Sequence, residues 1–358
     1  MDVLEYELDP RGDIFLTLDN VSKDLPDKLL DITKVSGWPN ELNNPAIPES
    51  DQRKPANEGS PGNKIDSIQT PECPPRRLLK IRASSKHLIL ACRQFERSLQ
   101  PGFQEGATLR ATGSVRFPIR DWEAVPFLIL MLIIHQRTRM VPKQISFQRM
   151  AEIAQLVDYY ECHEAVELFA DLWLTDLKIK SGTPNSVRCA EMMLFISWVF
   201  NQAPAFKVSS KYLESMSTSM ISFDKLPVPR LIQDEINLSR RTLITRIIES
   251  MNKLFSDLRD SGVQCSERCD CARLGALVKG MHRIGILSMS IFSTLEGISF
   301  TKLAQDCRKI TTPASACGKA SYNACSIYST VDPVLKVAEK LNVGLNISQF
   351  DNLRCSNS

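Results

Sequence analysis

Three cysteines lie close together in the last third of the chain, at Cys265, Cys269 and Cys271. Thiolates spaced this closely can bind zinc tetrahedrally if the fold brings in a fourth ligand. The candidates for that ligand are Cys307, Cys317, Cys325 and His282. The sequence therefore predicts a candidate zinc site at Cys265, Cys269, Cys271 and Cys307. The spacing, three residues and then one, differs from the usual two-and-two zinc knuckle, so packed free thiols and redox-active thiols stay open as alternatives.

The other reactive side chains form no recognisable catalytic pattern. Cys162 and His163 are adjacent in the sequence, but a nucleophile needs its base within hydrogen-bond reach and a third group that orients the base. Packing at a helix junction is the simpler interpretation of both, and His87 and His135 fall on or beside apolar helix faces. The chain has four histidines and no glycine-rich phosphate loop, GxSxG elbow, HExxH or Walker pattern. We therefore expect no enzymatic activity.

The charge balance argues against nucleic acids and membranes as partners. Lys and Arg number 44 against 41 Asp and Glu, which leaves a net charge of +3. Arg240, Arg241 and Arg246 form a small basic patch, which we interpret as the solvated face of a helix. DNA binding would need a denser basic surface and an element that reads the bases.

The overall composition is that of a globular protein, and 358 residues suffice for two domains. The first residues are acidic and do not resemble a secretory signal. The longest apolar run, residues 125–134, is too short to span a bilayer. Eleven cysteines without a secretory signal suggest reduced thiols, so we expect the cytoplasm or the nucleus.

The amino-terminal half mixes strand and helix patterns. Residues 12–18 and 77–82 predict strands, and residues 20–75, rich in proline, glycine and polar residues, predict a disordered insert. This insert acts either as a spacer or as a partner-binding tail with Ser-Pro and Thr-Pro sites at Ser60 and Thr70. The further expected elements are a helix over residues 86–99, extended pieces over 108–111 and 114–117, a helix from a cap at Asp121 to about His135, and two helices within 147–177 that begin at a Ser146 cap and break at 159–162.

The carboxy-terminal half reads as helical. Apolar residues at three- and four-residue steps predict helices over residues 188–201, 231–259, 274–281, 300–310 and 334–341. Gly262 is the expected end cap of the long helix. Residues 311–330 are expected to be irregular, and the chain after residue 349 is expected to fray. The predicted fold class is thus α+β, with a small sheet capped by helices and then an all-α domain.

The order of these amino-terminal elements carries a family resemblance. The matching segments are Gly12-Asp13-Ile14, residues 84–91, Phe95, Phe103-Gln104-Glu105-Gly106, Trp122-Glu123-Ala124, residues 130–135 and residues 156–162. Together they resemble the BTB/POZ domain, in the divergent form common in filamentous-fungal proteins. The likeness covers roughly residues 8–180 without the insert. It departs from the family at Cys92-Arg93-Gln94, where a Ser-Pro is usual, and in the very short segment before the first strand.

The resemblance implies a domain plan and a function. The BTB/POZ-like domain would comprise residues 1–19 and 76–180, with an insert at 20–75, a helical domain at 181–349 and a frayed tail at 350–358. The chain would be a protein–protein interaction scaffold that forms a homodimer or acts as an adaptor for a cullin-type ubiquitin ligase. In adaptors of this family an apolar-x-acidic tripeptide contacts the cullin, and Phe103, Gln104 and Glu105 fall at the matching place. The alternative is a transcriptional or chromatin-associated regulator with a zinc-stabilised carboxy-terminal segment.

Overall fold

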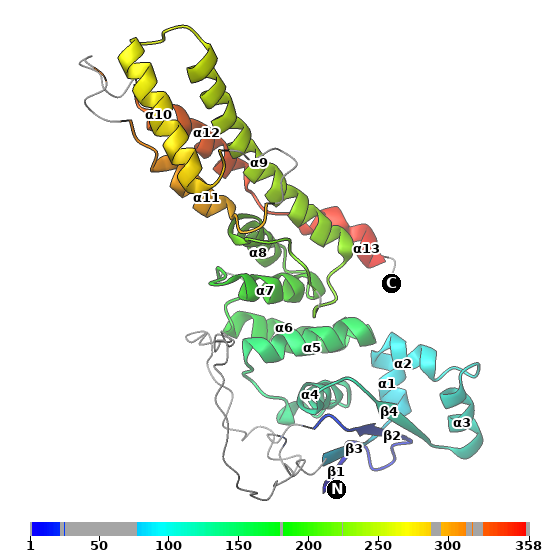
Figure 1. Cartoon of the computed structure of the whole chain (residues 1–358). Helices are drawn as coiled ribbons and strands as arrows, with labels where there is room; N and C mark the ends of the chain where they lie inside the picture. Colours follow the sequence, from blue (N-terminus) through cyan, green and yellow to red (C-terminus); the bar gives the residue numbers. More distant parts are fainter. Residues whose placement is uncertain are drawn as a thin grey trace, which may run out of the picture. The chain divides into compact units, whose positions relative to one another are not determined.

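A computed structural model describes residues 2–21, 25, 77–179, 182–223, 225–287, 295–312, 317 and 325–355. The chain divides into two compact units, Met1–Leu177 and Lys178–Ser358, and each is described by itself (Figure 1). The predicted disordered insert lies outside the described residues except for Asn20, Val21 and the buried Leu25.

The amino-terminal unit contains a four-stranded sheet in the order β1-β3-β2-β4. Its strands are β1 (Asp2–Glu7), β2 (Ile14–Leu18), β3 (Arg77–Ala83) and β4 (Val115–Ile119). The pairing of β2 with β3 is antiparallel, whereas β1 pairs with β3 and β2 pairs with β4 in parallel. Leu16 of β2 lies opposite Ile81 of β3, so the two strands predicted from the sequence are neighbours.

Strand β1 is an element that the sequence analysis missed. Leu4 and Tyr6 of β1 and Leu8 just after it are buried, while Glu5 and Glu7 are exposed. This period of two is the usual pattern of a strand with one face on the core. The acidic residues between the apolar ones make this segment polar on average, although its apolar residues alternate.

The helical segment after β3 is divided in two. Helix α1 covers Ser85–Ala91 and α2 covers Arg93–Ser98, instead of the single helix predicted over residues 86–99. Cys92 separates them with an extended backbone, at φ −132° and ψ 112°. Its N–H still donates to the Leu88 carbonyl and its carbonyl accepts from the Glu96 N–H, so the buried Cys92 ends one helix and starts the next.

Residues 108–111, predicted to be extended, belong instead to helix α3 (Gln104–Thr112). The helix ends at Gly113, whose left-handed φ of 75° favours glycine. Gly106 in its first turn lies against the carbonyls of Leu99 and Gln100, where a Cβ atom would clash. Local alternation over four residues was therefore a weaker signal than this capped helix.

Helix α4 (Ala124–Ile134) forms the centre of the amino-terminal unit. All of its residues are buried, and it lies between the sheet and the pair α5 (Phe147–Tyr160) and α6 (His163–Asp176) (Figure 1). A short 3-10 turn, η3 (Thr138–Met140), follows it. The N-terminal cap of α4 is Glu123 and not the predicted Asp121, which has a left-handed φ of 67°.

The predicted break between α5 and α6 is confirmed. Ser146 caps α5 by accepting a hydrogen bond from the Arg149 N–H at 3.1 Å, as predicted. The helix continues to Tyr160, and Glu161 then adopts a left-handed φ of 51° before α6 begins. Tyr160 stacks on Phe95 of α2 with ring centroids 5.0 Å apart, which ties this junction to the core.

The described part of the carboxy-terminal unit is helical. Its elements are α7 (Val187–Val199), α8 (Ala203–Met216), α9 (Arg230–Asp260), α10 (Glu267–Ile284), α11 (Phe300–Arg308), α12 (Ile327–Leu341), η6 (Ile347–Phe350) and α13 (Asp351–Cys355). Helix α9 packs against α8, α10, α11 and α12 (Figure 1). Helix α8 was not predicted, and α10 and α12 both begin several residues earlier than expected.

Two local predictions in this unit were wrong. Ser261, with an extended backbone, ends α9, and Gly262 does not take the left-handed conformation of a cap. The chain after residue 349 forms η6 and α13 instead of fraying, because Phe350 is buried against Phe206 at a centroid distance of 6.2 Å. Residues 356–358 lie outside the described residues.

Arg240 does not belong to a solvated basic face. It is 3% exposed, and its guanidinium donates hydrogen bonds to the carbonyls of Ser217, Leu295 and Ile298 at 2.8–3.0 Å. Arg241 and Arg246 are exposed on the same helix. None of the helices in the described ranges combines the length and the apolar character that crossing a membrane requires.

Candidate metal centre and candidate partner-binding loop

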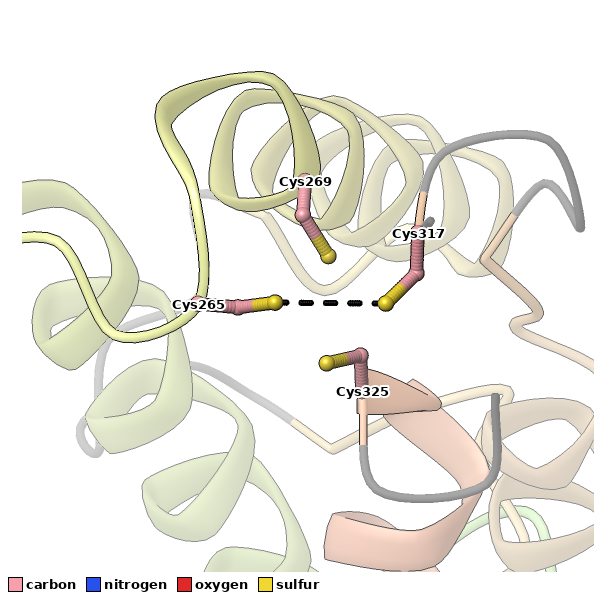
Figure 2. Close-up of side chains that lie close together, drawn as sticks. All are labelled: Cys265, Cys269, Cys317 and Cys325. Atoms are coloured by element: carbon pink, nitrogen blue, oxygen red, sulfur yellow. Dashed lines mark hydrogen bonds between the residues drawn. The ribbon is translucent and has the colours of Figure 1, made fainter. Parts of the chain in front are cut away.

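Four cysteines converge in the carboxy-terminal unit. The sulfur atoms of Cys265, Cys269, Cys317 and Cys325 all lie within 4.8 Å of one another. The Sγ atoms of Cys265 and Cys317 are 3.9 Å apart, and Figure 2 shows all four side chains turned toward a common centre. Cys269 and Cys325 are buried, while Cys265 and Cys317 are partly exposed.

Two segments far apart in the sequence supply these thiols. Cys265 lies in the connection between α9 and α10, and Cys269 lies in the first turn of α10. Ser266 caps that turn by accepting a hydrogen bond from the Cys269 N–H at 3.2 Å. Cys325 directly precedes the Ser326 cap of α12. Two helices, α10 and α12, therefore begin beside the four cysteines.

The structure brings together only part of the predicted zinc set. Cys265 and Cys269 belong to the group, but Cys271 is exposed and Cys307 is buried in the apolar core of the helices. Cys317 and Cys325, two of the four candidates for the fourth ligand, take their places, and His282, another of these candidates, is exposed.

The helical geometry of α10 explains this correction. Cys269 and Cys271 both lie in that helix, where a step of two residues turns a side chain by about 200°. The two thiols therefore face opposite sides, and only Cys269 faces the other sulfurs. The two-residue step between Cys269 and Cys271 would have predicted these opposite directions if the start of the helix at Glu267 had been known.

The protein environment raises the pKa of both buried thiols, Cys269 and Cys325. Burial, followed by the neighbouring Cys325 and Cys265 thiols, raises the pKa of Cys269 to about 12. Hydrogen bonding with Cys265 and Cys317 raises the pKa of Cys325. A cation among the sulfurs reverses these shifts, because it stabilises the thiolates that would otherwise repel one another.

The three residues of the predicted partner-binding loop lie at the start of α3 in the amino-terminal unit. Phe103 is the residue before the helix, and its side chain is 53% exposed. Gln104 is exposed and Glu105 is partly exposed in the first turn. Phe103 is also fixed by its backbone, since its N–H donates to the Gln100 carbonyl and its carbonyl accepts from the Ala107 N–H, at 3.1 and 3.0 Å.

Gln104 and Glu105 also border a groove of about 980 Å³ over the outer face of the sheet. The strand register places Glu7, Arg82, Phe15 and Arg116 in one row across this face. Lys80 pairs with Glu5 at 3.0 Å and Arg82 pairs with Glu7 at 3.5 Å, while the Arg82 guanidinium lies 5.7 Å from the centre of the Phe15 ring. The groove is thus polar and charged, with Phe15 as a partly exposed aromatic residue.

Cys162 and His135 are buried, whereas His163, for which packing was also predicted, is exposed at the start of α6. Cys162 is buried between α5 and α6, where hydrogen bonding with Cys92 and burial raise the pKa of its thiol. His135 accepts a hydrogen bond from the Ser84 N–H at Nε2, at 3.0 Å, and its Nδ1 lies 2.9 Å from the Met131 carbonyl. These contacts match the packing roles predicted for Cys162 and His135.

Comparison with known proteins adds no relative: no protein-family model, no curated protein and no solved structure matches this chain.

Proposed function

We propose that this chain is a non-catalytic interaction protein, in which a BTB/POZ-like amino-terminal unit binds partner proteins and a zinc ion holds the carboxy-terminal helical unit together. The observation that carries the zinc part of the proposal is the convergence of four cysteine sulfurs within 4.8 Å.

The distance between the Cys265 and Cys317 sulfurs fits a single tetrahedral ion. A Zn–S distance of about 2.3 Å places the sulfurs of a tetrahedral site about 3.8 Å apart. The Cys265–Cys317 separation of 3.9 Å agrees with that value. An iron–sulfur cluster fits less well, because two or more irons with bridging sulfides hold some of the cysteine sulfurs farther apart.

Four protein ligands also indicate the role of the ion. A catalytic zinc keeps one coordination position open for water or substrate, whereas a structural zinc is closed by four protein ligands. Cys265, Cys269, Cys317 and Cys325 fill all four positions. In the proposed role the ion links the first turn of α10 to the start of α12 and carries out no reaction.

Metal analysis of gently purified full-length protein tests the zinc site. We expect about one zinc per chain, and we expect Cys269→Ser and Cys325→Ser to lose most of it. Cys271→Ser is the matched control, because Cys271 lies two residues from Cys269 on the same helix but is exposed and outside the group. Zinc-free wild-type protein, or equal zinc in all variants, would refute the site.

Partner binding by the amino-terminal unit is supported by its topology and by the Phe103 loop. The strands β2, β3 and β4 and the helices α1, α2, α4, α5 and α6 occur along the chain in the sequence expected from the resemblance, whereas β1 and α3 are additional elements that it did not include. An exposed aromatic residue beside a carboxylate suits a buried anchor with a charge at its rim. The proposed partner is a cullin-type ligase scaffold, with self-association as a second use of the unit.

A pull-down with a cullin tests this assignment. Phe103→Ala and Glu105→Arg should each reduce the recovered cullin by tenfold or more, because truncating an interface anchor costs roughly 2 kcal/mol or more. Leu90→Ala is the control, since Leu90 is also an exposed apolar residue, at 88% exposure, but lies on α1. Equal recovery with all variants would exclude the Phe103 loop as the contact.

A further inference from the structure

The four candidate ligands receive unequal support from the local backbone. Cys269 is held by α10 itself, through the Ser266 cap. Cys265 precedes that helix and has no regular element to hold it. A ligand in a loop needs another anchor if its thiol is to stay within bonding distance of an ion.

Asp270 supplies that anchor. Its Oδ2 atom accepts hydrogen bonds from the backbone N–H groups of Gln264 at 2.7 Å and of Cys265 at 3.3 Å. Both bonds hold the segment before α10 against the first turn of the same helix. The carboxylate of Asp270 therefore fixes the backbone that carries the Cys265 thiol.

Arg273 in turn holds Asp270. Its Nη1 atom lies 3.6 Å from the Asp270 Oδ1 atom and donates to the Gln264 Oε1 atom at 3.1 Å. The arginine is 6% exposed, so this pair is largely removed from water. Removing a charge pair from water is costly, and such a pair is weak evidence for a stabilising role. The geometry of the pair instead indicates that it positions the segment that carries Cys265, because both residues contact that segment.

We propose that Asp270, held by Arg273, is the positioning residue for the Cys265 ligand, an inference that rests on the proposed zinc site. Groups that orient metal ligands from outside typically change metal affinity by about 10- to 100-fold when they are removed. A carboxylate beside four thiolates would by itself repel them, and the Arg273 guanidinium offsets that charge. The essential property of Asp270 is accordingly its two accepted hydrogen bonds, with its charge secondary.

The test compares Asp270→Ala with Asp270→Asn in the full-length holoprotein. The asparagine Oδ1 can still accept both backbone N–H groups, whereas alanine cannot. We expect Asp270→Ala to release zinc to a chelating dye about 10- to 100-fold faster than wild type, and Asp270→Asn to stay within a few-fold. In the cobalt-substituted protein, Asp270→Ala should weaken the absorption of a four-thiolate site, because Cys265 is displaced.

Glu267→Ala is the matched control, since Glu267 is an exposed acid in the same first turn. Wild-type release rates and cobalt spectra in Asp270→Ala would overturn the positioning role while leaving the zinc site intact. A wild-type protein without metal would overturn the zinc site itself. If Asp270→Ala loses helix content by circular dichroism, Arg273→Gln is tested in its place. Zinc release from Arg273→Gln should be faster than from wild type, and an unchanged rate would contradict the proposal.

Discussion

The two units present their candidate sites in opposite ways. In the amino-terminal unit, Phe103, Gln104 and Glu105 are consecutive residues at the start of one helix, and they lie at the surface. In the carboxy-terminal unit, Cys265 and Cys317 are 52 positions apart in the chain and meet at 3.9 Å. The first site needs only a correctly placed turn, whereas the second exists only when α10 and α12 are packed in their native positions.

The two units also differ in the interactions that hold their elements together. The amino-terminal unit closes around α4, whose residues are all buried, so burial of apolar surface holds its elements. In the carboxy-terminal unit an apolar core joins α9, α11, α12 and the later turns of α10, and the four cysteines form a second contact between the start of α10 and the segment before α12. A metal ion should therefore matter for one unit and be irrelevant for the other.

Metal removal should have the largest effect, and it should act on the carboxy-terminal unit alone. Zinc binding by small structural sites contributes about 10–16 kcal/mol, more than any single substitution. A strong chelator should increase hydrogen exchange in peptides from the first turns of α10 and α12. Peptides from α4 and α5 should keep their wild-type protection. A chelator effect of equal size in both units would contradict the division of roles.

The next largest effect should come from the core of the amino-terminal unit. Phe95 is 1% exposed and contacts the rings of Tyr160 and Phe117 at centroid distances of 5.0 and 5.6 Å. Phe95→Ala should lower the free energy of unfolding of this unit by about 3–5 kcal/mol. Urea titration followed by hydrogen exchange of α5 peptides measures the change. Phe15→Ala is the control, because the Phe15 side chain is 38% exposed, and it should lower the free energy of unfolding far less. An equal decrease in both variants would show that the groove face is buried in solution.

A smaller effect, which depends on pH, is expected at Glu214 in the carboxy-terminal unit. This side chain is 1% exposed, and burial raises its pKa from 4.5 to about 7. A carboxyl whose pKa is higher in the folded state destabilises the fold as it ionises. Stability should therefore fall as the pH rises from about 4.5 to 7, by roughly 3 kcal/mol in full.

Glu214→Gln should remove that slope, since the amide cannot ionise. Thermal unfolding between pH 4.5 and pH 8 measures it, with Glu235→Gln at an exposed site of α9 as the control. If the stability of Glu214→Gln varies with pH in the same way as that of wild type, ionisation of the Glu214 carboxyl does not destabilise the fold.

Elements could be predicted from the sequence where a pattern was long or was closed by a specific cap. The periodicity of α9 and the Ser146 cap of α5 were both predicted, as was the junction at Glu161. Predictions were wrong or absent where the pattern was short. Strand β1 was hidden by its acidic residues, and α3 was mistaken for extended chain because four residues carry too little periodicity to decide.

The candidate metal site shows the same limit. The cluster at Cys265 and Cys269 and the need for a distant ligand were visible in the residue spacing. The choice among Cys271, Cys307, Cys317 and Cys325 was not, because it depends on which way each thiol faces after the helices pack. Helix α10 turns Cys271 outward, and α11 turns Cys307 into the apolar core.

The long helices, the residues able to bind a metal and the consecutive Phe103 loop could be predicted from the sequence, because they depend on periodicity and composition within a few turns of chain. Only the tertiary structure decided which four cysteines meet and that Asp270 anchors the first of them. The physical reason is that a tetrahedral site requires sulfurs from distant segments within a few ångströms. Side-chain spacing along the chain carries no information about that distance until the helices have packed.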